Sequence, residues 1–146
     1  PITKEFGDGP VALSADGRLL AAPGMGGTIQ IWSLADGALL RTLVGHRDQI
    51  NDLAFSRDGA WLISGSGTIQ SGVAGPYDTT ARLWRVESGS QVRIVEGILS
   101  PEKSDWLDLF NVRGLPIRAV ALAPDGRAAG VITSDGSVRF WPQKLP

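Results

Sequence analysis

The 146-residue sequence contains no cysteine and only one histidine, one tyrosine and one methionine. The absence of cysteine excludes a disulfide framework and a thiolate metal site. A hydrolytic triad would have to use the one histidine, His46, and the sequence has no Gly-x-Ser-x-Gly elbow. We therefore expect no catalytic residues, no metal site, no cofactor and no enzymatic activity.

Charged residues are also scarce, at 20% of the chain, and 14 basic side chains are balanced by 15 acidic ones. This balance disfavours nucleic acid or an acidic membrane as a partner held by bulk electrostatics. No apolar run approaches the length of a transmembrane helix, and the first ten residues lack the basic and apolar regions of a signal peptide. We expect a soluble, cytoplasmic protein.

Glycine and proline, by contrast, are abundant, with 19 and 9 residues, and they predict many turns between short strands. Three segments repeat one order of features, an Asp-Gly turn followed by an alternating strand that ends in tryptophan. The segments are Val11–Trp32, Ile50–Trp84 and Ile117–Trp141, with turns at Asp16-Gly17, Asp58-Gly59 and Asp125-Gly126. The aspartate and the tryptophan are 16 positions apart in the first and third copies and 26 in the second, which carries ten extra residues.

Period-two alternation predicts the strands within each copy. In the first copy they fall near residues 18–22, 28–32 and 38–44. Asp-Gly between two apolar runs favours a short hairpin, because both residues tolerate a positive φ. No segment within the copies has the residue pattern of a crossover helix. Four antiparallel strands that recur at about 40–45 residues predict the blades of an all-β propeller.

These residues resemble the WD-repeat β-propeller family over nearly the whole chain. Gly45-His46 stands where the family has its Gly-His pair, Ser64 at its second-strand serine, and Asp78 at its tight-turn aspartate six residues before Trp84. The resemblance implies that His46, Ser64, Asp78 and Trp84 form the family's structural hydrogen-bonded tetrad. A buried imidazole needs partners for both ring nitrogens, and a carboxylate fixes its tautomer.

The other two copies depart from this pattern. The first has Ala22 and Gly26 at the serine and aspartate positions, and the third keeps Asp135 but has Gly114-Leu115 in place of Gly-His. The repeating tryptophans, Trp32, Trp84 and Trp141, predict packing in the core or between blades. Trp61, which follows an Asp-Gly turn, is expected in a strand at the blade surface.

The resemblance divides residues 1–146 into a three-bladed propeller segment. Its parts are an outer, blade-completing strand at 2–6, blade one at 10–44, blade two at 47–96 with an insertion at 67–77, a loop insertion at 97–116 and blade three at 117–141. Propellers have about four to eight blades. We therefore expect a partial ring that is completed either by a second copy, as a homo-oligomer, or by the rest of a larger propeller chain.

The resemblance places both insertions on one face, the face most used for partners. Ser100-Pro101-Glu102 is typical of a helix start, and Trp106, Leu109 and Phe110 then form an apolar stripe. The stripe is either an aromatic anchor for a protein partner or, as is more common, packed on its own sheets. The partner-binding candidates are Tyr77, Asp105, Trp106, Asp108, Phe110 and Arg113.

The leading functional hypothesis is a non-catalytic protein-interaction scaffold or adaptor that uses the loop-rich face. The alternative is small-molecule or glycan sensing at the propeller channel, as part of a larger regulatory protein. Asn51, Asp52 and Arg118 are the polar candidates for that channel site. The fold alone does not name the partner, because propellers carry many unrelated functions.

Overall fold

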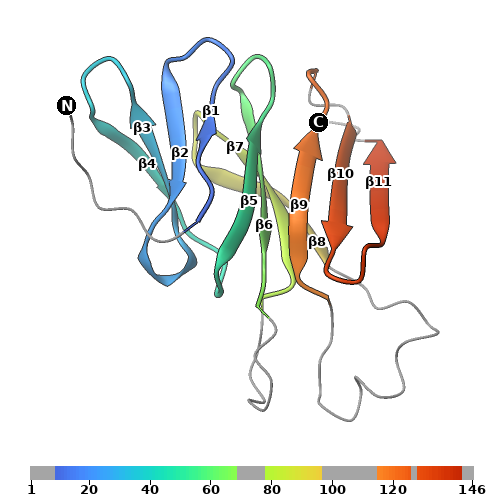
Figure 1. Ribbon diagram of the computed structural model, residues 1–146. Coiled ribbons are helices and arrows are strands. Elements are labelled where there is room, and N and C mark those ends of the chain that lie inside the picture. The colour runs from blue at the N-terminus through green and yellow to red at the C-terminus, as the bar shows by residue number, and fades with distance from the viewer. Residues whose placement is uncertain (1–8, 69–77, 97–114, 126–127, 143–146) are drawn as a thin grey trace.

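The computed structural model describes residues 9–68, 78–96, 115–125 and 128–142. Figure 1 shows three antiparallel sheets standing side by side, which confirms the predicted propeller-blade architecture. Sheet one contains β1 (Ala12–Leu13), β2 (Leu19–Pro23), β3 (Ile29–Ser33) and β4 (Leu39–Leu43), with a short 3₁₀ turn, η1 (Met25–Gly27), between β2 and β3. Sheet two contains β5 (Ile50–Phe55), β6 (Trp61–Ser66), β7 (Thr80–Arg85) and β8 (Ser90–Glu96). Sheet three contains β9 (Ile117–Leu122), β10 (Ala128–Thr133) and β11 (Val138–Pro142).

Each sheet packs against the next through one face, because successive residues of a strand point to opposite faces. Between sheets one and two, Ile29, Ile31 and Leu43 meet Leu62 and Trp84 in one buried cluster. The register places Leu62 opposite Trp84 and Ile29 opposite Leu43, so both pairs lie on the facing sides. The tryptophan of sheet two is therefore a packing residue between sheets, and only 1% of its surface is exposed.

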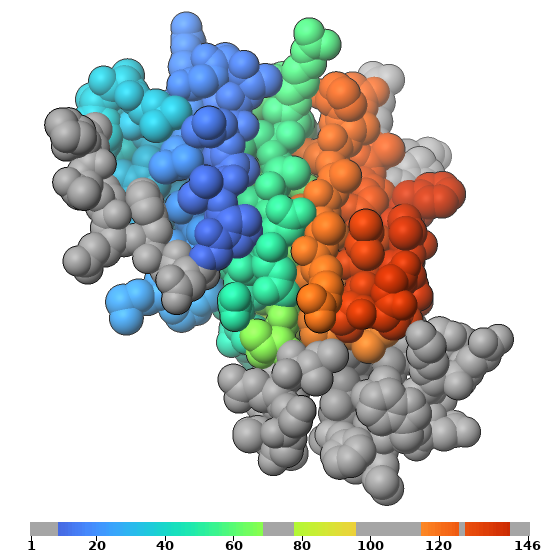
Figure 2. All heavy atoms as spheres, viewed as in Figure 1, coloured from blue at the N-terminus to red at the C-terminus, as the bar shows by residue number. Residues whose placement is uncertain are grey.

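A second cluster fills the space between sheets two and three. Trp61, Ile63 and Leu83 contribute from sheet two, and Ile117 and Val131 contribute from sheet three. Trp61 is only 6% exposed, so its expected position at the blade surface was wrong. The side chain points to the face that sheet three covers, and the Arg85 guanidinium lies 4.5 Å from the centre of its ring. Sheet two thus buries side chains on both of its faces. Figure 2 shows it between sheets one and three.

The Asp-Gly turns are longer than the expected hairpins. In the first, the Ser14 hydroxyl donates to the Asp16 carboxylate at 2.6 Å, and the Leu19 backbone N–H donates to the Ser14 hydroxyl at 2.9 Å. In sheet two, Ser56 and Asp58 make the same contact at 2.6 Å. The aspartate therefore acts as a hydrogen-bond acceptor that holds the turn, and these bonds lower the pKa of Asp16 and Asp58.

Exposed apolar side chains lie on the outer faces of sheets one and three. On sheet three, Val138 and Phe140 of β11 are 66% and 83% exposed on the side away from sheet two. On sheet one, Val11 and Leu13 are each 60% exposed. These are the faces that a second copy or further blades are expected to cover, because large apolar faces are rare on isolated domains.

Candidate functional site

The structure brings the four predicted tetrad residues together between sheets one and two. Trp84 Nε1–H donates to the Ser64 hydroxyl at 2.8 Å, and that hydroxyl contacts His46 Nε2 at 2.7 Å. On the other side of the imidazole, His46 Nδ1 lies 2.9 Å from the Asp78 carboxylate. The network ties the link before β5 to strands β6 and β7.

The donors in this network fix the tautomer of the histidine. Because an indole N–H only donates, the Ser64 hydroxyl accepts from Trp84 and donates its own proton to His46 Nε2. His46 Nδ1 then carries the ring proton and donates it to the Asp78 carboxylate. Every polar atom of the buried imidazole is thus satisfied in the neutral form, and a second ring proton would compete with the proton of Ser64.

The electrostatics of the pair agree with a neutral histidine beside an ionised carboxylate. Burial lowers the pKa of His46 and outweighs the hydrogen bond that the ring donates to Asp78, which alone would raise that pKa. Burial by itself would raise the pKa of Asp78, but hydrogen bonds from His46, Thr80 and the Arg47 backbone N–H hold it well below its usual range.

The lowered pKa of His46 predicts a pH-dependent stability. The unfolded chain binds a proton near its ordinary pKa of about 6.5, whereas the folded chain resists it. The free energy of unfolding is therefore at its full value above about pH 6.5 and falls as the pH is lowered, by at most about 1.4 kcal/mol per pH unit.

Urea unfolding between pH 7.5 and 5.5 measures this slope. His46→Gln is the control, because His46 is the only histidine in the chain and its removal should flatten the slope. Equal slopes in the two proteins would contradict a buried neutral histidine.

The aspartate of sheet three helps to hold its own turn. Asp135 accepts from the Thr133 hydroxyl at 2.6 Å and from the Ser137 backbone N–H at 3.0 Å, within its own turn. Sheet one has Ala22 and Gly26 at the serine and aspartate positions. Trp32 is half-buried in β3, and Trp141 lies in β11 opposite Ala129. Among the described sheets, the full tetrad of Trp84, Ser64, His46 and Asp78 belongs to sheet two.

Comparison with known proteins matches this pattern. Residues 37–85, which contain all four tetrad residues, match the family model described as WD domain, G-beta repeat. The chain belongs to the WD-repeat family of β-propeller proteins. The periodic tryptophan protein 2 homolog of Schizosaccharomyces pombe is 33% identical over 132 residues, which cover 90% of this chain and 12% of that protein. The small ribosomal subunit protein RACK1y of Oryza sativa subsp. japonica is 31% identical over 131 residues, covering 90% of this chain and 33% of that protein.

Structural comparison places the chain in the same fold. The crystal structure of the Myceliophteria thermophila Cps50 (Swd1) β-propeller domain superposes with a TM-score of 0.72 at 20% identity, over 99% of this chain and 38% of that one. The chain thus spans about one eighth of the length of the first relative and about a third of the second.

The two ends of the WD-repeat sheets differ in character. We call one end the linker rim. It comprises the described linkers at residues 24–28, 45–49, 67–68, 78–79, 115–116 and 134–137, together with the first two residues of β9, 117–118. The opposite end, the turn rim, consists of the turns at residues 15–18, 34–38, 56–60, 86–89 and 123–125. The insertions leave and rejoin the described chain at Thr68, Asp78, Glu96 and Leu115, all at the linker end of the sheets (Figure 1).

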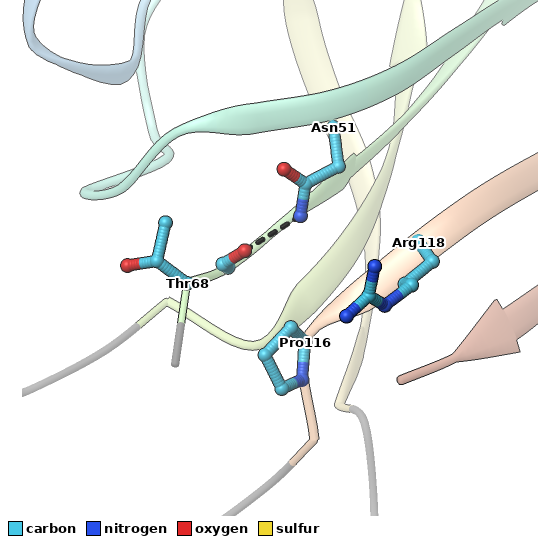
Figure 3. A pocket seen from close by; sticks show the side chains of 5 residues that line it. Asn51, Thr68, Pro116 and Arg118 are labelled. Atoms are coloured by element: carbon cyan, nitrogen blue, oxygen red, sulfur yellow. Dashed lines mark hydrogen bonds between the residues drawn. The ribbon is translucent and has the colours of Figure 1, made fainter. Parts of the chain in front are cut away.

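Two hollows open on the linker rim. The first, about 400 Å³, lies between sheets two and three and is lined by Asn51, Gly67, Thr68, Pro116 and Arg118 (Figure 3). The second, about 350 Å³, lies between sheets one and two and is lined by Pro23, Gly24, Gly26, Gly27, Arg47, Asp48, Gln49 and Ile50. A hydrogen bond connects their walls, since the Thr68 hydroxyl donates to the Asp48 carboxylate at 3.0 Å.

The predicted channel residues separate in the structure. Asn51 and Arg118 line the first hollow, whereas Asp52 is not among its lining residues. The Asp52 carboxylate accepts from the Val120 backbone N–H at 2.8 Å and so joins sheets two and three. The candidates Tyr77, Asp105, Trp106, Asp108, Phe110 and Arg113 lie outside the described residues, as does the strand expected at 2–6.

Within the described ranges, no group of three or more acidic or histidine side chains is arranged to hold a metal ion. In the same part of the chain, no helix is long and apolar enough to cross a membrane.

Proposed function

We propose that this chain is a non-catalytic protein-interaction scaffold that holds its partners at the linker rim. The observation that carries the proposal is the pair of hollows opening side by side on that rim, each beside an exposed arginine. Among the described residues, neither Arg47 nor Arg118 forms an ion pair. Arginine is enriched at protein interfaces because its flat guanidinium packs and donates several hydrogen bonds at once.

The position of the insertions supports the proposal. The linker rim carries both long insertions, and loops on a rigid frame tolerate the length that a binding surface needs. Two hollows on the rim that carries both insertions fit partner capture from that side.

The proposal predicts that partner binding depends on the arginines of one rim only. Arg47→Ala/Arg118→Ala should weaken capture of proteins from the native source by about tenfold or more, because central arginines contribute strongly to interfaces. The matched control is Arg18→Ala/Arg57→Ala, which removes two exposed arginines from the turn rim. Quantitative mass spectrometry of proteins retained on the immobilised chain gives the comparison, followed by titration of each retained protein.

Equal loss in both double variants, or loss only in the turn-rim variant, would contradict the proposal. Thermal unfolding of each variant accompanies the capture, and we expect all midpoints to stay close to that of the parent chain because the four side chains are exposed.

A further inference from the structure

We propose that the hollow between Asn51 and Arg118 binds a carboxylate of an acidic peptide segment on the partner. This inference rests on the proposed scaffold function and specifies what one part of the linker rim recognises. The hollow has a volume of about 400 Å³, which lies within the range of roughly 300–1,000 Å³ that is usual for ligand sites. Figure 3 shows Asn51 and Arg118 reaching it from β5 and β9, on either side of the junction between sheets two and three.

Arg118 supplies the positive charge of this site. Its side chain is exposed, and among the described residues it has no ion-pair partner. Figure 3 places its guanidinium beside Pro116, at the edge of the hollow. A guanidinium remains charged at all physiological pH values and presents paired N–H groups that match the two oxygens of a carboxylate.

Asn51 supplies a hydrogen-bond acceptor in a fixed orientation. Its Nδ2 donates to the Gly67 carbonyl at 2.6 Å and to the Ile117 carbonyl at 2.9 Å. Because both N–H groups are used, the amide cannot flip, and Oδ1 remains the acceptor that faces away from these carbonyls. A ligand that satisfies both residues carries an anionic group for Arg118 and an N–H donor for Asn51. A peptide with an acidic side chain or a free C-terminus has this combination.

The surrounding charges favour a carboxylate over a phosphate. The Asp48 carboxylate is held by Thr68, which lines the hollow, and the Asp52 carboxylate is held by the Val120 backbone N–H. Fixed negative charges beside the site repel a dianion more strongly than a monoanion. Of these two anions, a single carboxylate is therefore the better match for Arg118.

The floor of the hollow is rigid. Gly67 has a φ of +133°, and a Cβ at this position would lie 2.9 Å from the Pro116 Cα and 2.9 Å from the Asp78 carbonyl oxygen. Sheets two and three thus meet here in backbone contact, with the Asn51 amide bridging them. Such a preformed site binds its ligand with little loss of conformational entropy.

NMR titration of the ¹⁵N-labelled chain tests the inference. The probes are N-acetylglutamate N-methylamide, which has a side-chain carboxylate, and N-acetylglycine, which has a terminal one. N-acetylglutamine N-methylamide is the neutral control, and inorganic phosphate is the competing anion. We expect saturable shifts of the Arg118 Nε–H and Asn51 Nδ2 signals with the carboxylates. Tighter binding of the first probe identifies an acidic side chain as the source, and tighter binding of the second identifies a C-terminus.

Three variants make the titration decisive. Arg118→Gln should weaken binding of the carboxylates by about tenfold, the equivalent of one charge-assisted contact. Arg118→Lys, which keeps the charge but loses the paired donors, should fall between Arg118→Gln and the parent chain. Arg57→Gln, on the turn rim, should bind as the parent chain does. Equal binding of the neutral probe, tighter binding of phosphate, or unchanged affinity in Arg118→Gln would overturn the inference.

The two proposals fail separately. If partner capture depends on Arg118 while the carboxylate probes give no saturable shifts, the carboxylate site is wrong and the scaffold function stands. If the carboxylates bind but capture is the same in the two arginine double variants, the linker-rim scaffold is wrong and the anion site stands.

Discussion

Replacing Asp78 with alanine is expected to lower the free energy of unfolding by about 3 kcal/mol, the effect usual for breaking a buried charged network. The Asp78 carboxylate accepts hydrogen bonds from His46, from Thr80 and from the Arg47 backbone N–H, and it lies 3.3 Å from the Arg82 guanidinium. The substitution removes the acceptor of each of these groups and leaves the buried imidazole with one unsatisfied nitrogen. Urea unfolding at pH 7.5 measures the loss.

Two further substitutions calibrate this prediction. Ser64→Ala removes only the hydroxyl between Trp84 and His46, and we expect a loss of about 1–2 kcal/mol. Thr79→Ala changes the neighbour of Asp78 in the chain, and the Thr79 residue is only half-buried. The free energy of unfolding of this variant should stay within about 0.5 kcal/mol of that of the parent chain. If Asp78→Ala were no more destabilising than Thr79→Ala, the tetrad would not stabilise the contact between sheet two and the link before β5.

Gly27→Ala is expected to destabilise the chain by about 3 kcal/mol, which combines backbone strain with overpacking. Gly27 has a φ of +75°, and a Cβ there would lie 2.7 Å from the His46 carbonyl oxygen and 2.9 Å from its carbonyl carbon. Neither backbone atom can move without displacing the link that carries His46. The same link forms one wall of the second hollow.

Gly26→Ala is the matched control for this substitution. Gly26 also has a positive φ, +68°, but a Cβ there would meet no atom within 4 Å. The Gly26→Ala variant should therefore lose only the free energy that corresponds to backbone strain, about 1 kcal/mol. Thermal or urea unfolding of the two variants separates backbone strain from steric crowding. Equal losses of unfolding free energy would mean that the turn at Gly27 is not tightly packed against the backbone of His46.

The sequence predicted the sheets well because their signals are local. The strands found at 19–23, 29–33 and 39–43 lie one residue from those expected, since period-two alternation and turn residues both act within a few positions. The tetrad was also predicted, because four residues match the positions at which the WD-repeat family has its histidine, serine, aspartate and tryptophan. The Ser–Asp contact in the turns was not predicted, although the pairing of Ser14 with Asp16 and of Ser56 with Asp58 was a visible signal.

Features that depend on how sheets face one another were harder to predict. Trp61 was expected at a surface because alternation alone does not say which face the next sheet covers. Asp52 and Asn51 stood together as polar residues on β5, yet one joins the backbone of β9 and the other bridges two carbonyls beside the hollow. Their separate roles follow from the stacking of sheets two and three, which brings residues more than 60 positions apart into contact.

The tetrad and the linker rim are connected through the link before β5. The tetrad fixes the link that begins at Gly45, and the same link supplies Arg47 and Asp48 to the second hollow. Asp48 in turn holds Thr68 at the first hollow. A structural network in the interior therefore positions polar groups at the surface that we propose as the partner site.

Hydrogen–deuterium exchange of the chain with and without a captured partner tests the central claim most directly. The account predicts slower exchange in the bound state for peptides that cover residues 24–28, 45–49 and 115–118, with the turns at 15–18, 56–60 and 86–89 unchanged. Protection confined to those turns, with the linker rim exchanging as in the free chain, would contradict it.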